Sequence, residues 1–228
     1  MQVLLFLHRL YFFVILNIRN KKTYKMKKII FLFIISSLIS IKGIGLTLSP
    51  ETEVSILTCA PGNELYSLFG HTAIRINDPR HQIDRVYNYG TFDFSTPHFY
   101  LKYARGLLPY QLTVQKFSHF IYNYQLEERT VYAQTIRLDS LEKQRIFDLL
   151  EENLLPQNRY YLYNFLFDNC TTRSRDILLK SLPDSVAWNM PDVNKNFWNL
   201  LDEYLQASPW VQWGIHTILG QRGNRMAT

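Results

Sequence analysis

Cys170 is the residue best placed to perform nucleophilic chemistry. It follows Asp168-Asn169, residue types that cap helix N-termini, so we expect it at the start of a helix. Unpaired backbone amides and the helix dipole stabilise a thiolate at that position. Arg173 and Arg175 add positive charge nearby. The pattern predicts that Cys170 is a cysteine nucleophile.

The second cysteine, Cys59, lies in the apolar run 53–59 and is interpreted as a small core residue. Two cysteines in an oxidising compartment could instead form a disulfide. Under that alternative, Cys59 and Cys170 would be bonded, and the protein would be a non-catalytic binding module of the cell envelope. Both interpretations stay open from the sequence.

A thiolate nucleophile requires a base within hydrogen-bond reach, and His71 is the best candidate among the six histidines. Gly70 precedes it and an apolar strand follows. Because glycine allows close backbone approach, it would bring the imidazole to the edge of a cleft. A third residue should orient the imidazole, and Asn88 and Asp93 are the candidates for that role.

A metal site is the competing use of cysteine and histidine. It would need three or four ligands at recognisable spacing, and no CxxC, HxxxH or HExxH pattern occurs in the sequence. We therefore expect no metal and no other cofactor.

The elements that must position these residues follow a simple order along the chain. Residues with strand character come first, and helical patterns come after them. The expected strands are 53–59, 71–76, 86–89, 110–114 and 130–138. One helix follows a capping box at Asp139 and Glu142, and a second begins near Cys170. This order predicts an α+β fold, an antiparallel sheet packed against helices.

The net charge of +6 is unevenly distributed. Residues 1–45 contain eight basic and no acidic residues, which leaves 17 basic against 19 acidic residues in the remainder. A basic head on a nearly neutral body is typical of an export signal and argues against nucleic-acid binding.

The basic head is expected to be a signal peptide at 26–45. Met26-Lys27-Lys28 is a charged start, 29–41 is an apolar run, and Gly43 and Gly45 are small residues before a cleavage site. Residues 1–25 are interpreted as a spurious upstream extension, with a membrane anchor at 3–16 as the alternative. Residues 46–228 would then be one exported periplasmic domain.

Four blocks of sequence carry a resemblance to a known family. They are 57–76 (LTCAPGNELYSLFGHTAIRI), 86–94 (VYNYGTFDF), 99–106 (FYLKYARG) and 167–176 (FDNCTTRSRD). Together they resemble the Lnb N-terminal periplasmic domain family. More distantly, a strand-initial histidine ahead of an Asn-Cys helix start resembles the circularly permuted papain-like folds of lecithin:retinol acyltransferase and its relatives.

This resemblance implies N-acylation of lipoproteins, with a phospholipid as acyl donor and a membrane surface nearby. Cys170 would carry the acyl group as a thioester and His71 would activate the thiol. The helix-start amides of Cys170 and Thr171 would stabilise the oxyanion. Family members usually continue into membrane helices, so a chain that stops at Thr228 is expected to be shortened. A papain-like peptidase or amidase acting on cell-wall peptides is the alternative activity.

Overall fold

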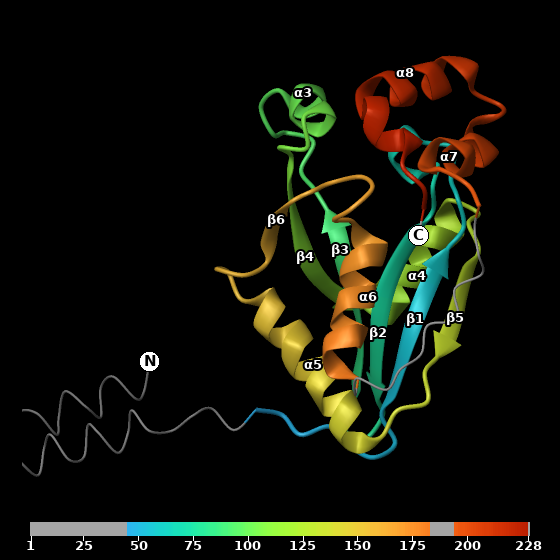
Figure 1. Ribbon diagram of the computed structural model, residues 1–228. Coiled ribbons are helices and arrows are strands. Elements are labelled where there is room, and N and C mark those ends of the chain that lie inside the picture. Colours follow the sequence, from blue (N-terminus) through green and yellow to red (C-terminus); the bar gives the residue numbers. More distant parts are fainter. Residues whose placement is uncertain (1–44, 183–193, 228) are drawn as a thin grey trace, which may run out of the picture. The chain divides into compact units, whose positions relative to one another are not determined.

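The computed structural model describes residues 45–182 and 194–227, apart from the side chains of Tyr100 and Ala104 (Figure 1). The predicted upstream extension at 1–25 and nearly all of the predicted signal peptide at 26–45 lie outside these residues and stay predictions. Within the described residues, no helix is long and apolar enough to cross a membrane.

Six strands form one sheet in the spatial order β5-β1-β2-β3-β4-β6, and every neighbouring pair is antiparallel. The strands are β1 (Glu53–Cys59), β2 (His71–Asp78), β3 (Ile83–Thr91), β4 (Pro109–Lys116), β5 (Val131–Thr135) and β6 (Tyr160–Leu162). The five expected strands are all present, and β6 is an additional short one.

The described helices are α3 (Phe99–Ala104), α4 (Phe117–Leu126), α5 (Ser140–Leu154), α6 (Cys170–Ser181), α7 (Phe197–Leu205) and α8 (Pro209–Leu219), with 3-10 turns η1 (Leu65–Ser67) and η2 (Gly220–Asn224). Both expected helices are present as α5 and α6. The predicted α+β fold, an antiparallel sheet packed against helices, is confirmed.

Alternation along the strands creates two apolar clusters on opposite sides of the sheet. On one side, Val54, Ile74 and Tyr87 pack with side chains of α5 and α6. On the other side, Leu57 and Ala73 pack with α4. Figure 1 shows α5 and α6 in front of the sheet and α4 behind it. Because α6 packs against β2 and β3, its first residue is held near the ends of those two strands.

A buried carboxylate fastens the segment that leads into β1. Asp78, at the end of β2, accepts hydrogen bonds from the Ser49 amide at 2.9 Å and the Ser49 hydroxyl at 2.7 Å. His81 Nδ1 lies 2.7 Å from the same carboxylate. Burial opposes ionisation of Asp78, but the hydrogen bonds from His81 and Ser49 hold its pKa below the ordinary value.

We expect Asp78→Ala to lower the free energy of unfolding by about 3 kcal/mol, because the buried amide and hydroxyl of Ser49 lose their acceptor and the partly exposed His81 ring loses its partner. Asp84→Asn is the control: Asp84 pairs with Arg75 but is 42% exposed, so its loss should cost less than about 1 kcal/mol. Since the folded pKa of Asp78 is depressed, its stabilisation should be lost as the pH falls below about 4. Urea unfolding at several pH values measures both effects, and equal costs for the two variants would contradict the prediction.

Candidate active site

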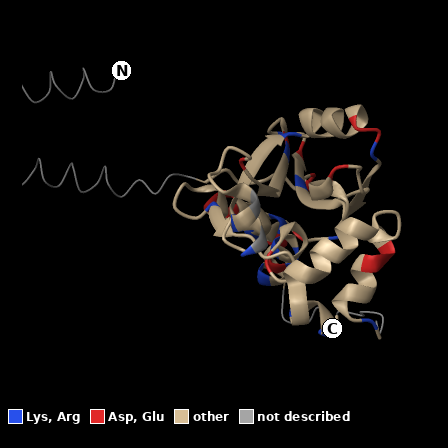
Figure 2. Ribbon diagram, turned by 90° about the horizontal axis from the view of Figure 1, so that it is seen from above, with Lys and Arg blue, Asp and Glu red and all other residues tan. Residues whose placement is uncertain are grey.

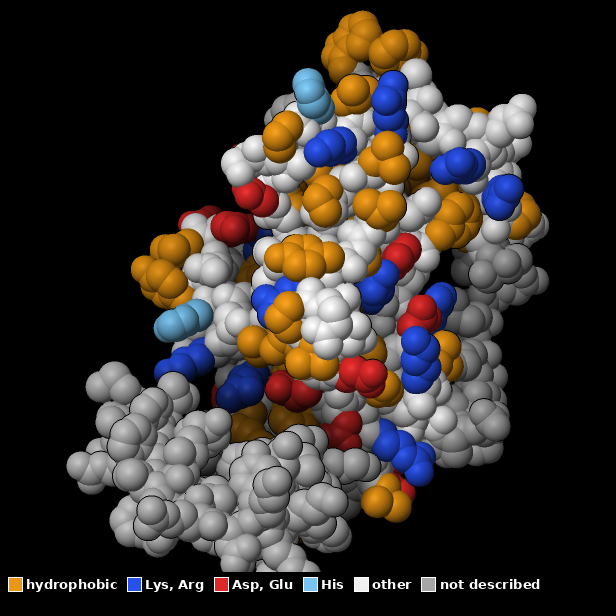
Figure 3. Space-filling view, turned by 90° about the vertical axis from the view of Figure 1, so that its left-hand side faces the viewer, with side chains coloured by type: hydrophobic (Ala, Val, Ile, Leu, Met, Phe, Trp, Pro, Cys, Tyr) orange, Lys and Arg blue, Asp and Glu red, His pale blue; other side chains and the backbone are white. Residues whose placement is uncertain are grey.

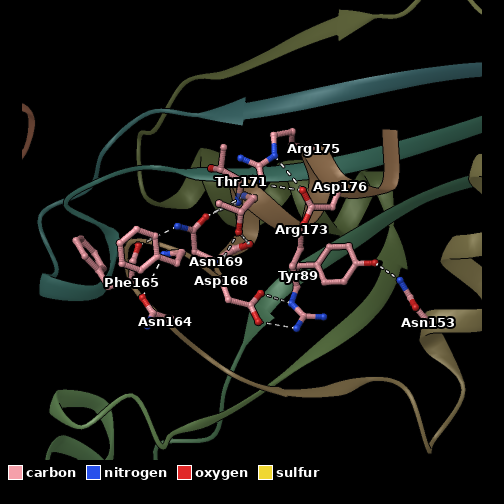
Figure 4. A network of polar contacts seen from close by, with 12 residues as sticks. Tyr89, Asn153, Asn164, Phe165, Asp168, Asn169, Thr171, Arg173, Arg175 and Asp176 are labelled. Atoms are coloured by element: carbon pink, nitrogen blue, oxygen red, sulfur yellow. Dashed lines mark hydrogen bonds and ion pairs between the residues drawn. The ribbon is translucent and has the colours of Figure 1, made fainter. Parts of the chain in front are cut away.

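The start of α6 is fixed by Asn169, which positions Cys170. Asn169 Oδ1 accepts hydrogen bonds from the amides of Thr171 and Thr172, both at 3.0 Å, and the Thr172 hydroxyl accepts from the Asn169 amide at 2.8 Å. The Asn169 side-chain amide also donates to the Phe165 carbonyl at 2.8 Å. Figure 4 shows this network. It orders both the helix start and the loop before it, so Cys170 is the first residue of α6, as the sequence predicts.

The two arginines after Cys170 do not supply the free positive charge that the sequence suggested. Arg173 makes a two-pronged ion pair with Asp168 at 2.6 and 2.8 Å, and Arg175 pairs with Asp176 at 2.7 Å (Figure 4). The arginine guanidinium groups are thus neutralised by neighbouring carboxylates, and neither is among the groups that lower the pKa of Cys170. Asp168 is correspondingly an ion-pair partner and not the helix cap.

His71 is the first residue of β2, and its Nε2 lies 2.6 Å from Oδ1 of Asn88 on β3. Because an amide oxygen can only accept, this contact places the ring proton on Nε2 and leaves Nδ1 as the basic nitrogen. Of the two candidates for orienting His71, Asn88 is the one that contacts it. Asp93, the other candidate, lies beyond β3, where its carboxylate accepts from the amide and hydroxyl of Ser95 at 2.8 and 2.7 Å.

Two glycines allow the close packing that positions the His71 imidazole. Gly70 has φ of +72°, and a Cβ added there would lie 2.5 Å from the Cys59 carbonyl oxygen, so the close backbone approach expected before His71 is present. Gly90 has φ of +100°. A Cβ added at Gly90 would lie 3.6 Å from both the Cys170 Cβ and the His71 Cε1. The nucleophile candidate and the base candidate therefore face the same point on β3.

The surroundings of Cys170 favour its thiolate. Burial is the largest single influence and opposes ionisation, but hydrogen bonding and charge from His71, together with the Thr72 backbone amide and the Thr171 side chain, outweigh it. The pKa of Cys170 is consequently below the ordinary thiol value. The Thr171 hydroxyl is itself held 2.9 Å from the Thr72 hydroxyl. The Thr72 amide was not identified from the sequence, because a backbone group leaves no residue signature.

Of the two amides expected to stabilise an oxyanion, one is already engaged. The Thr171 amide donates to the Asn169 side chain that caps the helix, and its role as an oxyanion donor stays a prediction. The Cys170 amide, at the first helical position, has no acceptor among the described residues. It is the donor left at the helix start.

Both cysteines are free thiols, so the disulfide alternative does not hold in this structure. Cys59 is buried beside α4 as a core residue, and burial raises its pKa to about 11. Only one of the two thiols thus has an environment that favours ionisation.

Three tyrosines lie near Cys170. Tyr110, Tyr161 and Tyr163 are close enough to interact electrostatically with its sulfur, and the rings of Tyr110 and Tyr163 stack at 4.1 Å. The alternation of Tyr161 and Tyr163 at i and i+2 was the available sequence signal, since such residues point to one side of a strand.

A cavity of about 90 Å³ adjoins this tyrosine group. It lies between the end of α3, the loop before α6, and one side of the C-terminal helix region. Its lining is mainly apolar and aromatic, with two arginines: Tyr103, Arg105, Gly106, Tyr163, Asn164, Phe165, Leu166, Ile215, Ile218, Leu219 and Arg222. Tyr163 belongs to both the cavity wall and the surroundings of Cys170, so the two regions share a wall.

Comparison with known proteins gives one match. The model of a family described as the Lnb N-terminal periplasmic domain matches residues 47–202, a range that contains His71, Asn88 and Cys170. No curated protein and no solved structure matches the chain significantly.

Proposed function

The chain belongs to the Lnb N-terminal periplasmic domain family, and we propose that it transfers acyl groups through a thioester on Cys170. Membership of this family makes it an envelope-associated, periplasmic protein. The observation that carries the proposal is that Cys170 and His71 face the same point at Gly90 while Asn88 holds the far nitrogen of His71. A thiol, a base and a residue that orients the base are the parts that nucleophilic catalysis by cysteine requires.

The proposed reaction has two halves. His71 Nδ1 takes the thiol proton, and the Cys170 sulfur attacks the carbonyl carbon of a phospholipid ester. The carbon–oxygen ester bond breaks, the proton passes from His71 to the leaving glycerol oxygen, and a thioester and a lysophospholipid result. The amine of a lipoprotein then attacks the thioester, the carbon–sulfur bond breaks, and the amine proton returns to the sulfur through His71. The Cys170 amide would donate to the oxyanion in both halves.

The apolar lining of the neighbouring cavity supports an acyl substrate over a cell-wall peptide. Tyr163, Phe165 and Leu166 lie immediately before α6, and Ile215 and Ile218 face them from α8. Burial against such a lining stabilises a hydrocarbon chain, whereas a peptide backbone needs polar partners for its amides and carbonyls. We also propose a permuted papain-like arrangement, which the order of the histidine strand before the cysteine helix supports.

The proposal is tested by incubating the purified protein with a defined phospholipid and measuring its intact mass. We expect an added acyl mass that maps to the Cys170 peptide, is released by neutral hydroxylamine, and is discharged by a peptide with a lipidated N-terminal cysteine. Cleavage of cell-wall peptides without any acyl adduct would replace the proposal with the peptidase alternative.

A further inference from the structure

One end of the molecule combines exposed apolar residues with basic residues. We call it the α3/α8 surface. The exposed apolar residues are Leu101, Leu107, Trp210, Trp213 and Ile218, and the basic residues are Lys102, Arg105, Arg222 and Arg225. The cavity beside Cys170 is lined by both helical regions, so the two halves of the surface are neighbours. Figure 1 shows α3 and α8 at the same end of the sheet.

The α8 helix is built to present aromatic residues outward. Ile215, Ile218 and Leu219 recur at helical spacing and line the cavity, whereas Trp210 and Trp213 lie on the opposite side of the helix. Their side chains are 86% and 67% exposed. Two tryptophans this exposed on one short helix need an occupant to cover them, because their burial would remove a large apolar area from water.

The charges of the α3/α8 surface indicate which kind of partner would bind to it. The stretches 94–126 and 204–228 contain no Asp or Glu. The nearest carboxylates on α7 are engaged, Asp202 with His216 and Glu203 with Lys195. Neither Arg105 nor Arg222 has an ion-pair partner among the described residues. In Figure 3, hydrophobic and basic side chains lie together on the upper part of the face. Figure 2 views the molecule from this end, where most of the ribbon is neither acidic nor basic.

We propose that the α3/α8 surface docks the protein onto an anionic phospholipid bilayer, with Trp210 and Trp213 in the interface. Tryptophan prefers the boundary between headgroups and acyl chains, and arginine and lysine bind anionic headgroups. A second copy is a poorer occupant, because a twofold contact would bring the same unpaired arginines together.

Docking in this way would place the cavity, and through Tyr163 the surroundings of Cys170, beside the lipid. This inference rests on the proposed function in one respect, the reason for docking: the bilayer would contain the acyl donor. The docking itself requires only the surface residues, so it is measurable without any acyl transfer.

The test is vesicle flotation of the protein purified after expression and export of the full chain. We expect the protein to float with vesicles of phosphatidylglycerol and phosphatidylcholine, more weakly at high salt, and poorly with phosphatidylcholine alone. Trp210→Ser with Trp213→Ser should reduce binding roughly tenfold, and Arg105→Gln with Arg222→Gln by a similar factor. Tyr122→Ser with Tyr132→Ser, which removes two exposed aromatics from α4 and β5, should leave binding unchanged.

A second readout uses tryptophan emission, which brominated lipids should quench in the unsubstituted protein and far less after Trp210→Phe with Trp213→Phe. Equal losses in the tryptophan and tyrosine variants, or tryptophan-dependent dimers without vesicle binding, would overturn the proposal. Cys170→Ala should float like the unsubstituted protein. If flotation depends on Trp210 and Trp213 but no acyl adduct ever forms, docking stands and the proposed function fails.

Discussion

Replacing Cys170 with alanine is expected to abolish formation of the acyl adduct. The half-buried Cys170 thiol is the one whose pKa the surrounding groups lower, chiefly through His71. Alanine removes the only atom that could hold the acyl group at this position. Intact-mass measurement after incubation with phospholipid should therefore show no added acyl mass, a loss of at least about 10³-fold in labelling rate.

Cys170→Ser distinguishes a covalent intermediate from a binding effect. Serine keeps the size of the site but is a far weaker nucleophile at neutral pH. We expect slow labelling at most, and any adduct should resist neutral hydroxylamine because it would be an oxygen ester. Full, hydroxylamine-labile labelling of this variant would end the assignment of Cys170.

Cys59→Ala supplies the matched control for the same measurement. Its thiol is buried beside Phe120 and its pKa is raised to about 11, so it is almost wholly protonated at pH 8. The variant should form the adduct like the unsubstituted protein. In native protein at pH 8, iodoacetamide should modify Cys170 and leave Cys59 unmodified.

The sheet and the two helices that carry the site were predictable because their patterns are local. Val54 and Ile76 lie in runs whose alternation places them on one side of a strand, and both are buried in the core. The capping box of Asp139 and Glu142 is present at the start of α5. For the same reason, Asn169 and Cys170 revealed the start of α6.

The parts that could not be predicted depend on contacts between distant segments. Asn88 and Asp93 were equivalent in sequence, and only the pairing of β2 with β3 brings Asn88 to His71. The pairing of Arg173 with Asp168 is an exception, because the two residues are only five positions apart and their contact depends on the loop that turns back before α6. Helices α7 and α8 were missed although local signals for them exist: Asn196 and Asn199 form a capping box at the start of α7, and α8 begins with Ser208-Pro209 and ends at Gly220.

Replacing His71 with alanine should slow acyl transfer by about 10²–10⁴-fold and raise the pKa of Cys170. The folded protein holds that pKa below the ordinary thiol value because His71, with smaller contributions from Thr72 and Thr171, offsets the effect of burial. Without the imidazole, burial is the largest remaining influence and favours the neutral thiol. The pH at which iodoacetamide reactivity of Cys170 reaches half its maximum should therefore move upward, past the ordinary value near 8.5.

Asn88 should behave as a positioning residue, because it contacts His71 and not the thiol. Asn88→Ala removes the acceptor 2.6 Å from His71 Nε2, so it should slow transfer less than His71→Ala and shift the alkylation profile in the same direction. Asn88→Asp keeps an acceptor oxygen and should restore much of the rate. His119→Ala, on α4, is the control histidine and should change neither quantity. An unchanged alkylation profile in His71→Ala would mean that the imidazole does not influence the thiol, and His71 could then no longer be assigned as the base.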